Sequence, residues 1–183
     1  VRLTIRGLES AGVKASAIPA GISGHKSNQM LARLERDVLS KSPNWMTLSC
    51  GVNDVWHGKR GVNLADYKVN ITKIVDRCQD AGIKVVLLTS TMIGEDKDNA
   101  NNKKLSTYND FLKELATEKK CLLADLNVGM QSIIEASNDK KNGKLLTSDG
   151  VHMNADGNKM MATGVLEALG LNPEQIKAAQ AAW

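Results

Sequence analysis

The sequence predicts an α/β domain, a three-layer α/β/α sandwich built around a parallel sheet. Short apolar runs of strand length alternate with amphipathic helical segments along the chain. The run IKVVLLT, residues 83–89, is continuously apolar, as expected for a strand that is covered on both faces. The 183 residues suffice for one domain with a sizeable core and show no linker that would split them. We therefore expect a single domain over residues 1–183.

The first part of the chain is expected to alternate helix and strand twice. Apolar residues recur at helical spacing from Val1 and the pattern closes at a glycine, which predicts a helix over Val1–Gly12. The short apolar run Ala15–Ala20 predicts a strand that ends in a glycine-bearing loop. A helix is expected over Ser27–Ser40, with Ser27 as its N-cap. The run Trp45–Ser49 predicts the second strand.

The alternation continues to the end of the chain. Leu64–Ala81 places its apolar residues on one helical face and stops at Gly82, before the buried strand Ile83–Thr89. The polar loop 92–104 is expected to become helical in its later part. The remaining predicted elements are a helix at Leu105–Lys119, a strand at Cys121–Leu126, a helix at Met130–Ala136, a surface loop at 138–144, a helix at Asn158–Leu169, and a last helix with Asn172 as cap and Pro173 in its first position.

Composition argues against several functional classes. The net charge of +4 is mild, the basic residues are dispersed and aromatic residues are scarce, so nucleic-acid binding is not expected. The three cysteines form no CxxC pair and the three histidines lie far apart, so we expect no metal site, no cofactor and no disulfide framework. No apolar stretch is long enough to span a membrane. A soluble protein is expected, cytoplasmic, or exported if a signal peptide lies upstream of Val1.

Three polar loops carry residue types that are suited to chemistry. GISG at 21–24 and GVND at 51–54 each follow a predicted strand, and SDGVH at 148–152 lies near the end of the chain. In a parallel sheet such loops share one edge, so they can converge on one cleft.

The residues in these loops fit acyl transfer. A carboxylate at Asp149 can bond one imidazole nitrogen of His152 and leave the other nitrogen free as a base. A backbone N–H at Gly24 can approach a ligand closely, and the Asn53 amide offers a second donor to a developing oxyanion. Each motif alone also fits an ordinary turn, because Asn-Asp pairs and loop glycines are common. Their combination carries more weight.

The order GISG, GVND and SDGVHMN resembles the SGNH hydrolases, also called GDSL-type esterases and lipases, from Ala17 to about Leu169. The resemblance implies a flavodoxin-like α/β/α fold. It also implies that Gly24 and Asn53 donate to the oxyanion, and that Asp149 and His152 are the partners of a nucleophilic serine.

The sequence departs from that family at one point, because it has no GDS block. The resemblance implies that the nucleophilic serine and the first strand lie upstream of Val1, which makes the domain N-terminally incomplete. The isolated chain is then expected to fold poorly unless another segment fills the position of that strand. Other serines, such as Ser23 and Ser148, do not lie in a strand–turn–helix elbow. Cys50 is expected to be a packed residue at a strand end rather than a nucleophile.

These observations together favour a serine ester hydrolase that acts on a small-molecule or glycan ester, with a short acyl group such as acetyl, possibly on a carbohydrate. His57, Trp56 and His25 are candidates for substrate contact, although each also fits an ordinary loop or core position. One alternative is a non-catalytic module that binds a glycan or a protein, which the missing GDS block favours. Another is a flavodoxin-like nucleotide or receiver domain, but the chain lacks a GxGxxG or P-loop phosphate cradle. The number of subunits stays open.

Overall fold

The computed structural model describes residues 1–137 and 144–183. The surface loop predicted at 138–144 therefore lies outside the described residues, except for Lys144. In chain order the elements are α1 (Arg2–Ser10), α2 (Ser27–Ala32), α3 (Leu34–Asp37), the 3₁₀ turn η1 (Leu39–Lys41), β1 (Trp45–Ser49), α4 (Val52–Trp56), the 3₁₀ turn η2 (Gly58–Arg60), α5 (Leu64–Asp80), β2 (Lys84–Leu88), α6 (Ala100–Glu118), β3 (Leu122–Ala124), α7 (Leu126–Ala136), α8 (Ala155–Ala168) and α9 (Pro173–Ala181).

The described residues form a parallel sheet in the order β1-β2-β3, in which Leu48 pairs with Leu87 and Leu88 with Ala124. Successive side chains of β2 enter different clusters. Val85 and Leu87 pack in the cluster that includes the apolar faces of α5 and α6, whereas Val86 and Leu88 pack with Val165 of α8. The continuous apolar run of β2 is thus explained by helices on both faces.

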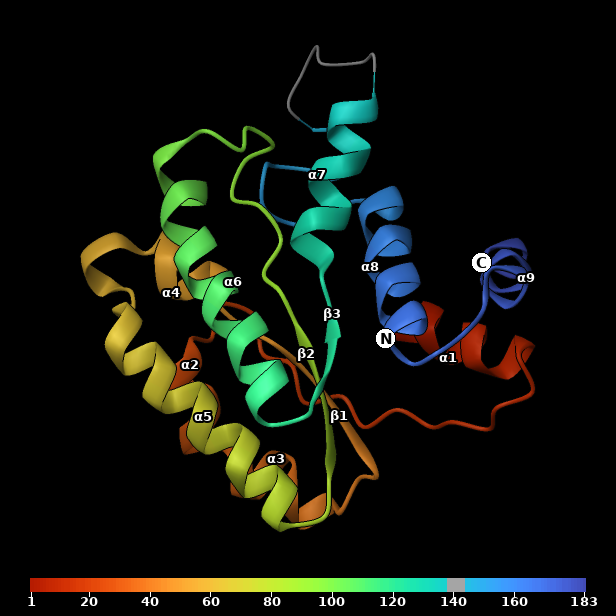
Figure 1. The fold of residues 1–183 in the computed structure, drawn as a ribbon, viewed down its shortest axis with the longest axis horizontal. Helices are drawn as coiled ribbons and strands as arrows, with labels where there is room; N and C mark the ends of the chain where they lie inside the picture. Colours follow the sequence, from red (N-terminus) through yellow and green to blue (C-terminus); the bar gives the residue numbers. More distant parts are fainter. Residues whose placement is uncertain (138–143) are drawn as a thin grey trace.

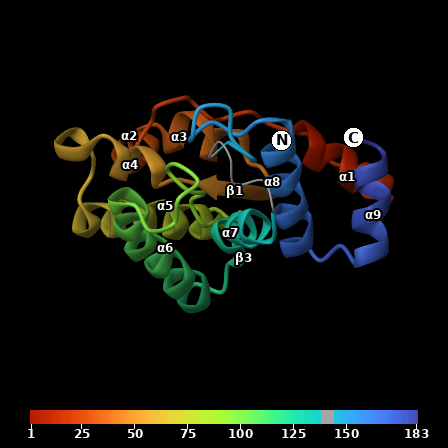
Figure 2. The same ribbon diagram turned by 90° about the horizontal axis from the view of Figure 1, so that it is seen from above.

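The ribbon shows α2, α5 and α6 on one side of the sheet and α8 on the other (Figures 1 and 2). Helices α1 and α9 pack on α8 and on each other. A Cβ at Gly7 of α1 would lie 2.4 Å from a methyl group of Leu166, so the glycine permits close approach of α1 to α8. The indole N–H of Trp183 donates to the Leu3 carbonyl at 3.0 Å. The predicted three-layer α/β/α sandwich is confirmed.

The strand predicted at Ala15–Ala20 is wrong. This segment forms no strand: Ile18 within it is 50% exposed, and Val13 and Ile22 on either side are 47% and 46% exposed. β1 is the edge of the sheet among the described residues, and no described strand lies between it and this segment. An apolar run becomes a strand only where a neighbouring backbone pairs with it, and this segment does not pair with the free edge of β1.

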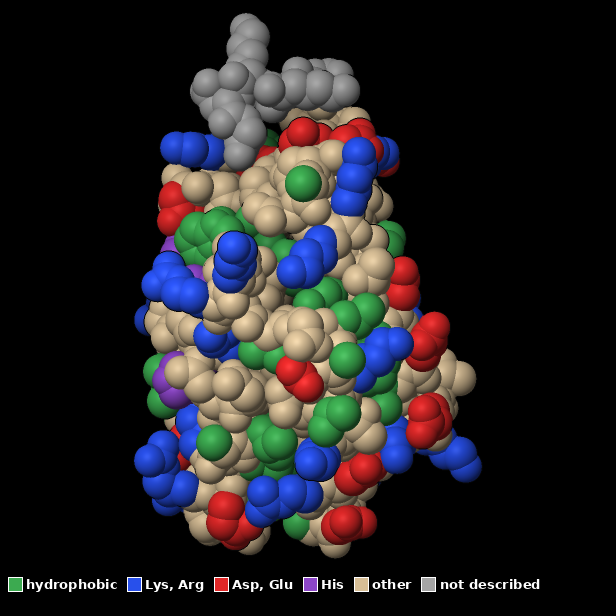
Figure 3. Space-filling view, turned by 90° about the vertical axis from the view of Figure 1, so that its left-hand side faces the viewer, with side chains coloured by type: hydrophobic (Ala, Val, Ile, Leu, Met, Phe, Trp, Pro, Cys, Tyr) green, Lys and Arg blue, Asp and Glu red, His purple; other side chains and the backbone are tan. Residues whose placement is uncertain are grey.

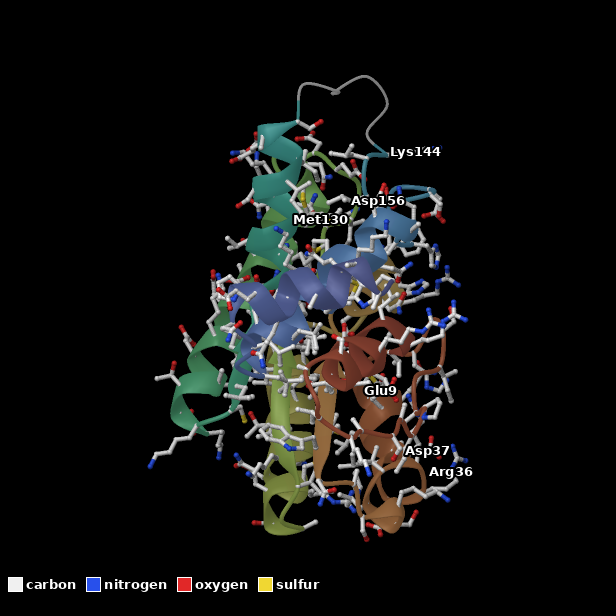
Figure 4. The ribbon with its side chains drawn as sticks, turned by 90° about the vertical axis from the view of Figure 1, so that its right-hand side faces the viewer. Glu9, Arg36, Asp37, Met130, Lys144 and Asp156 are labelled. Atoms are coloured by element: carbon white, nitrogen blue, oxygen red, sulfur yellow. The ribbon has the colours of Figure 1, made fainter. Side chains whose placement is uncertain are left out.

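The helix predicted at Ser27–Ser40 is interrupted. It divides into α2, α3 and η1, with a break at Arg33, where the guanidinium bonds the Asp37 carboxylate at 2.8 Å. Arg36 bonds the same carboxylate, and Figure 4 shows Arg36 and Asp37 at the end of the molecule opposite Lys144. The predicted N-cap was also wrong, because Ser27 is the first residue of α2 and its hydroxyl bonds Asp54 instead.

The other predicted helices and strands are present. Helix α6 begins at Ala100, so the later part of 92–104 is helical as expected, whereas α7 and α8 begin earlier than predicted. The N-caps of these three helices are Asn99, Asp125 and Asn154, whose side chains accept from backbone N–H groups in the first turn. The last helix has the predicted cap, Asn172, and Pro173 in its first position. Among the described residues, no helix is both long and apolar enough to cross a lipid bilayer.

Candidate active site

The site lies at the carboxyl ends of the strands, where α4 follows β1 and the segment 89–99 follows β2. The hairpin at 147–153 joins this edge through Gly94, whose N–H donates to the Gly150 carbonyl at 2.6 Å. Val151 of the hairpin packs against the core cluster that contains Cys50 and Val55. The late loop and the loop after β1 therefore lie against one core cluster, although they are about a hundred residues apart in sequence.

A tight hairpin presents Asp149 and His152. Thr147 and Met153 form an antiparallel bridge, and the Ser148 N–H donates to the His152 carbonyl at 2.8 Å. Asp149 Oδ1 accepts from the N–H groups of Val151 and His152, at 3.0 and 2.8 Å. Asp149 Oδ2 lies 2.7 Å from His152 Nδ1. The carboxylate thus folds the turn and contacts the imidazole at the same time.

These contacts change the acidity of Asp149. Its pKa is held well below the ordinary value, first by the hydrogen bond from the His152 N–H, then by the bond to the His152 ring and by the Val151 N–H. The carboxylate therefore stays ionised through the pH range in which an ordinary aspartate titrates.

We expect the Asp149 carboxyl group to titrate below about pH 4, the ordinary value for aspartate. Because the pKa is lowered in the folded state, the bonds of this carboxylate support the hairpin above the unfolded-state pKa. They are lost as the pH falls through the lowered folded-state pKa. Carbonyl NMR of the Asp149 side chain during an acid titration measures the midpoint. A midpoint at or above that of a free aspartate would contradict the hydrogen bonding described here.

Asn53 lies in the first turn of α4, directly after β1. Gly51 before it has φ +140°, and a Cβ there would lie 2.3 Å from Ser90 Oγ, so the sharp turn out of the strand requires glycine. Asn53 Nδ2 donates to the His25 carbonyl at 3.2 Å. An amide nitrogen carries two hydrogens, so this bond leaves a second hydrogen available to a ligand.

Asp54 joins this turn to the loop that carries Gly24. Its side chain is fully buried and accepts from the Ser27 N–H at 3.0 Å and from the Ser27 hydroxyl at 2.6 Å. Ser27 begins α2, three residues after Gly24. Asp54 therefore sets the start of α2 relative to α4.

Gly24 itself is exposed and has φ +77°, with open space where a Cβ would project. Its loop closes through the His25 N–H, which donates to the Ile22 carbonyl at 3.3 Å. The structure thus brings Asn53 to the Gly24–His25 loop and Asp149 to His152. Within the described ranges, no hydrogen bond connects these two groups to each other.

The three candidates for substrate contact lie in the same region. Trp56 ends α4 and is 43% exposed, and its ring centroid is 5.9 Å from that of His57. His25 is half-buried, and its Nδ1 has no hydrogen-bond partner. Figure 3 looks onto the side of the molecule that carries α5 and shows histidine and hydrophobic side chains at the surface among lysines and arginines.

The described residues offer His152 no nucleophile. No serine or cysteine among them donates to its ring, and the nearby hydroxyl of Ser148 bonds the His152 carbonyl at 3.1 Å. Burial, and then the neighbouring Asp54, raise the pKa of the Cys50 thiol well above its ordinary value. A thiol that resists ionisation is poorly suited to attack an ester. The described residues also contain no cluster of three or more His, Cys, Asp or Glu that could hold a metal ion.

The fold and the family match together define an esterase of the acylhydrolase class. Residues 3–160 match the GDSL-like lipase/acylhydrolase family, and the chain belongs to this family. The resemblance to the SGNH hydrolases drawn from the sequence motifs is thereby confirmed.

Relatives and solved structures agree with this placement. An acetylxylan esterase of Geobacillus stearothermophilus is 24% identical in a 157-residue alignment that covers 82% of this chain and 70% of that protein. The uncharacterized lipoprotein YqeF of Bacillus subtilis (strain 168) is 24% identical in a 166-residue alignment that covers 79% of this chain and 67% of that one. The crystal structure of the acetyl xylan esterase AlAXEase superposes with a TM-score of 0.82 at 30% identity, covering 92% of this chain and 89% of that one. The structure of Axe2, an acetylxylan esterase from Geobacillus stearothermophilus, gives a TM-score of 0.84 at 21% identity, over 92% of this chain and 80% of that one.

Proposed function

We propose that the protein is a serine ester hydrolase that removes a short acyl group, such as acetyl, from a carbohydrate. In this proposal His152 is the general base, Asp149 orients it, and Gly24 and Asn53 bind the oxyanion. The observation that carries the proposal is the 2.7 Å contact between Asp149 Oδ2 and His152 Nδ1, on an exposed hairpin at the carboxyl edge of the sheet. A purely structural turn has no need of an exposed imidazole that is oriented by a carboxylate.

The mechanism follows from this geometry. The bond to Asp149 holds the proton on Nδ1, so Nε2 is free to take the proton of a serine hydroxyl as its oxygen attacks the ester carbonyl. The carbonyl oxygen becomes an oxyanion, which accepts from the Gly24 N–H and from the free hydrogen of the Asn53 amide. His152 then gives its proton to the leaving alcohol. Water, activated by the same base, releases the acid from the acyl-enzyme.

The nucleophilic serine is proposed to come from outside Val1–Trp183. Two observations support this: the chain has no GDS block, and no described serine or cysteine bonds the His152 ring. The alternative of a binding module that lacks a nucleophile predicts glycan binding without turnover.

Several features support a short acyl group on a sugar. Two of the similar proteins are named acetylxylan or acetyl xylan esterases. Trp56 exposes part of an aromatic ring at the end of the helix that carries Asn53, which offers an apolar face to an acyl group or a sugar ring. His57 beside it and the unpartnered nitrogen of His25 can contact polar groups of the same substrate.

Substrate preference tests the proposal. The protein with its nucleophile in place is expected to release acetate from acetylated xylo-oligosaccharides, and to cleave p-nitrophenyl acetate at least about tenfold faster, in kcat/KM, than p-nitrophenyl palmitate. Acetate release and chromophore release measure the two reactions. Equal or faster cleavage of palmitate would contradict a short-acyl site. Binding of the oligosaccharide without acetate release, and without labelling by a fluorophosphonate, would favour the binding module.

A further inference from the structure

One carboxylate binds the strand at 145–147 that leads into the hairpin of Asp149 and His152. Glu95 Oε1 accepts from the N–H groups of Leu146 and Thr147 at 2.8 and 2.9 Å, and from the Thr147 hydroxyl at 2.8 Å. Glu95 Oε2 accepts from the Leu145 N–H at 2.6 Å. Three consecutive backbone amides and one hydroxyl therefore converge on a side chain about fifty residues earlier in the chain.

The backbone N–H groups of Leu146 and Thr147 require an acceptor such as the Glu95 carboxylate. Leu146 and Thr147 are buried, at 3% and 1% exposure, and a buried N–H without an acceptor is costly. The opposite strand of the hairpin pairs with the Leu146 carbonyl, which accepts from the Asn154 N–H at 3.0 Å, and it offers no backbone acceptor to the amides at 145–147 among the described residues. Glu95 thus supplies the acceptors that the hairpin itself does not.

The segment that carries Glu95 is itself held in place by α6. Asn102 Oδ1 accepts from the Ile93 N–H at 2.8 Å, and Asn102 Nδ2 donates to the carbonyls of Gly94 and Asp96. One residue before Glu95, the Gly94 N–H donates to the Gly150 carbonyl at 2.6 Å, at the tip of the hairpin. The hairpin is therefore bound at its base and at its turn by neighbouring residues of one fixed segment.

Apolar packing alone does not explain this arrangement. Leu146 packs with Met92, Met130 and Met160, and Figure 4 shows Met130 on α7 below Lys144, at the same end of the molecule. A cluster rich in methionine adapts its shape readily, so it sets how deeply Leu146 inserts but defines poorly how the hairpin is rotated. The directional hydrogen bonds that the Glu95 carboxylate accepts define that rotation, and with it the direction of the His152 ring.

We propose that Glu95 is a positioning residue for the Asp149–His152 pair: its carboxylate fixes the strand at 145–147, and through it the orientation in which the pair meets the substrate. Its catalytic consequence rests on the proposed function, in which His152 is the general base. Glu95 itself touches neither the imidazole nor the substrate in this proposal.

Three variants test the proposal. Glu95→Gln keeps the size of the side chain but puts an NH₂ group opposite backbone N–H donors. Thr147→Val is nearly isosteric and removes only the hydroxyl bond to Glu95. Asp96→Asn is the matched control, because Asp96 is adjacent in sequence and, among the described residues, its carboxylate accepts only within its own turn, from the Asp98 N–H at 2.9 Å.

The first readout is spectroscopic and needs no turnover. In the native chain, the His152 Nδ1 proton is expected downfield in ¹H NMR, and the Leu146 and Thr147 amides are expected to exchange slowly. Glu95→Gln should weaken or broaden the Nδ1 signal and speed exchange at both amides by about tenfold or more. Thr147→Val should shift both in the same direction by less. Asp96→Asn should leave them unchanged.

The second readout is kinetic, in the protein with its nucleophile in place. A displaced general base lowers kcat, so Glu95→Gln is expected to lose about ten- to a hundredfold in kcat with KM within about twofold. If Glu95→Gln lowered the unfolding midpoint but kept a native Nδ1 signal and a native kcat, the proposal would be overturned, because Glu95 would then stabilise the fold without positioning the Asp149–His152 pair. If Glu95→Gln does not fold, Thr147→Val decides by the same two criteria.

The two proposals can fail separately. A His152→Ala variant that is inactive beside a fully active Glu95→Gln variant overturns the role of Glu95 and leaves the proposed function standing. A His152→Ala variant that remains active overturns the proposed function and the catalytic consequence of Glu95. The Nδ1 signal then still reports whether Glu95 orients the pair.

Discussion

Replacing His152 by alanine is expected to lower kcat by at least about a thousandfold while the protein stays folded. In the proposed mechanism the imidazole accepts the proton of the nucleophile and then donates it to the leaving alcohol, and a methyl group can do neither. The side chain is 63% exposed, so its removal opens no cavity in the core. Ester hydrolysis under saturating substrate measures the loss, with circular dichroism and the unfolding midpoint as checks on the fold.

Ser148→Ala is the matched control for this experiment. It changes the same hairpin and removes the hydroxyl bond to the His152 carbonyl, but it leaves the imidazole and its bond to Asp149 in place. We expect its kcat to stay within about threefold of the native value, the range of a single exposed hydrogen bond. A large loss in this variant would instead identify Ser148 as a nucleophile. Full activity of His152→Ala would exclude His152 as the base.

Replacing Asn53 by alanine is expected to lower kcat by about a hundred- to a thousandfold, with a smaller change in KM. The amide would donate to the oxyanion, which forms only as the carbonyl is attacked, so its loss affects the transition state more than the bound ester. The same substitution removes the bond to the His25 carbonyl, which frees the Gly24 loop and adds to the loss.

Asn63→Ala separates this effect from general destabilisation. Asn63 is the N-cap of α5, ten residues after Asn53, and its side chain accepts from the Asp66 N–H at 2.9 Å. Loss of a cap costs about 1 kcal/mol of stability, and here it should leave kcat nearly unchanged at temperatures below unfolding. If both variants lost activity in proportion to their stability, an oxyanion role for Asn53 would be excluded.

The fold could be predicted from local patterns because its central elements have strong ones. β2 is a continuous apolar run, and the predicted inward face of α5 is buried at Tyr67, Ile71 and Ile74. Asp149 and His152 were found for a similar reason, since they lie three residues apart and meet within one turn. In each case the information is contained in a short window of sequence.

The misplaced elements depend on partners that are remote in sequence. Ala15–Ala20 has the composition of a strand, but a strand forms only when a neighbouring backbone pairs with it, and no strand of the described sheet pairs with this segment. Serine is a common N-cap residue, but the hydroxyl and the N–H of Ser27 both donate to the buried carboxylate of Asp54. Local propensity was overridden at Ala15–Ala20 because no strand pairs with it, and at Ser27 by a tertiary contact with Asp54.

Glu95 was not recognised from sequence because nothing in its surroundings marks it. It lies in the polar run GEDKDN, where a carboxylate usually faces water. Its partners at 145–147 are backbone amides, which carry no signal in a sequence. A side-chain acceptor for consecutive backbone amides can be found only when the two segments are seen together.

The unequal anchoring of the site bears on how its specificity can be changed. The hairpin of His152 is bound by Glu95 and Gly94, and Asn53 follows a glycine that tolerates no side chain. The residues from Ala17 to Gly24, by contrast, are largely exposed, and Trp56 ends its helix at the surface. Libraries for a new acyl or sugar acceptor should therefore diversify 17–23, 56, 57, 59 and 60, where most side chains are exposed, and leave Gly58, with its φ of +54°, together with 93–95 and 145–154 intact. The fold thus separates a largely exposed part of the site from a part that is bound tightly to its neighbours.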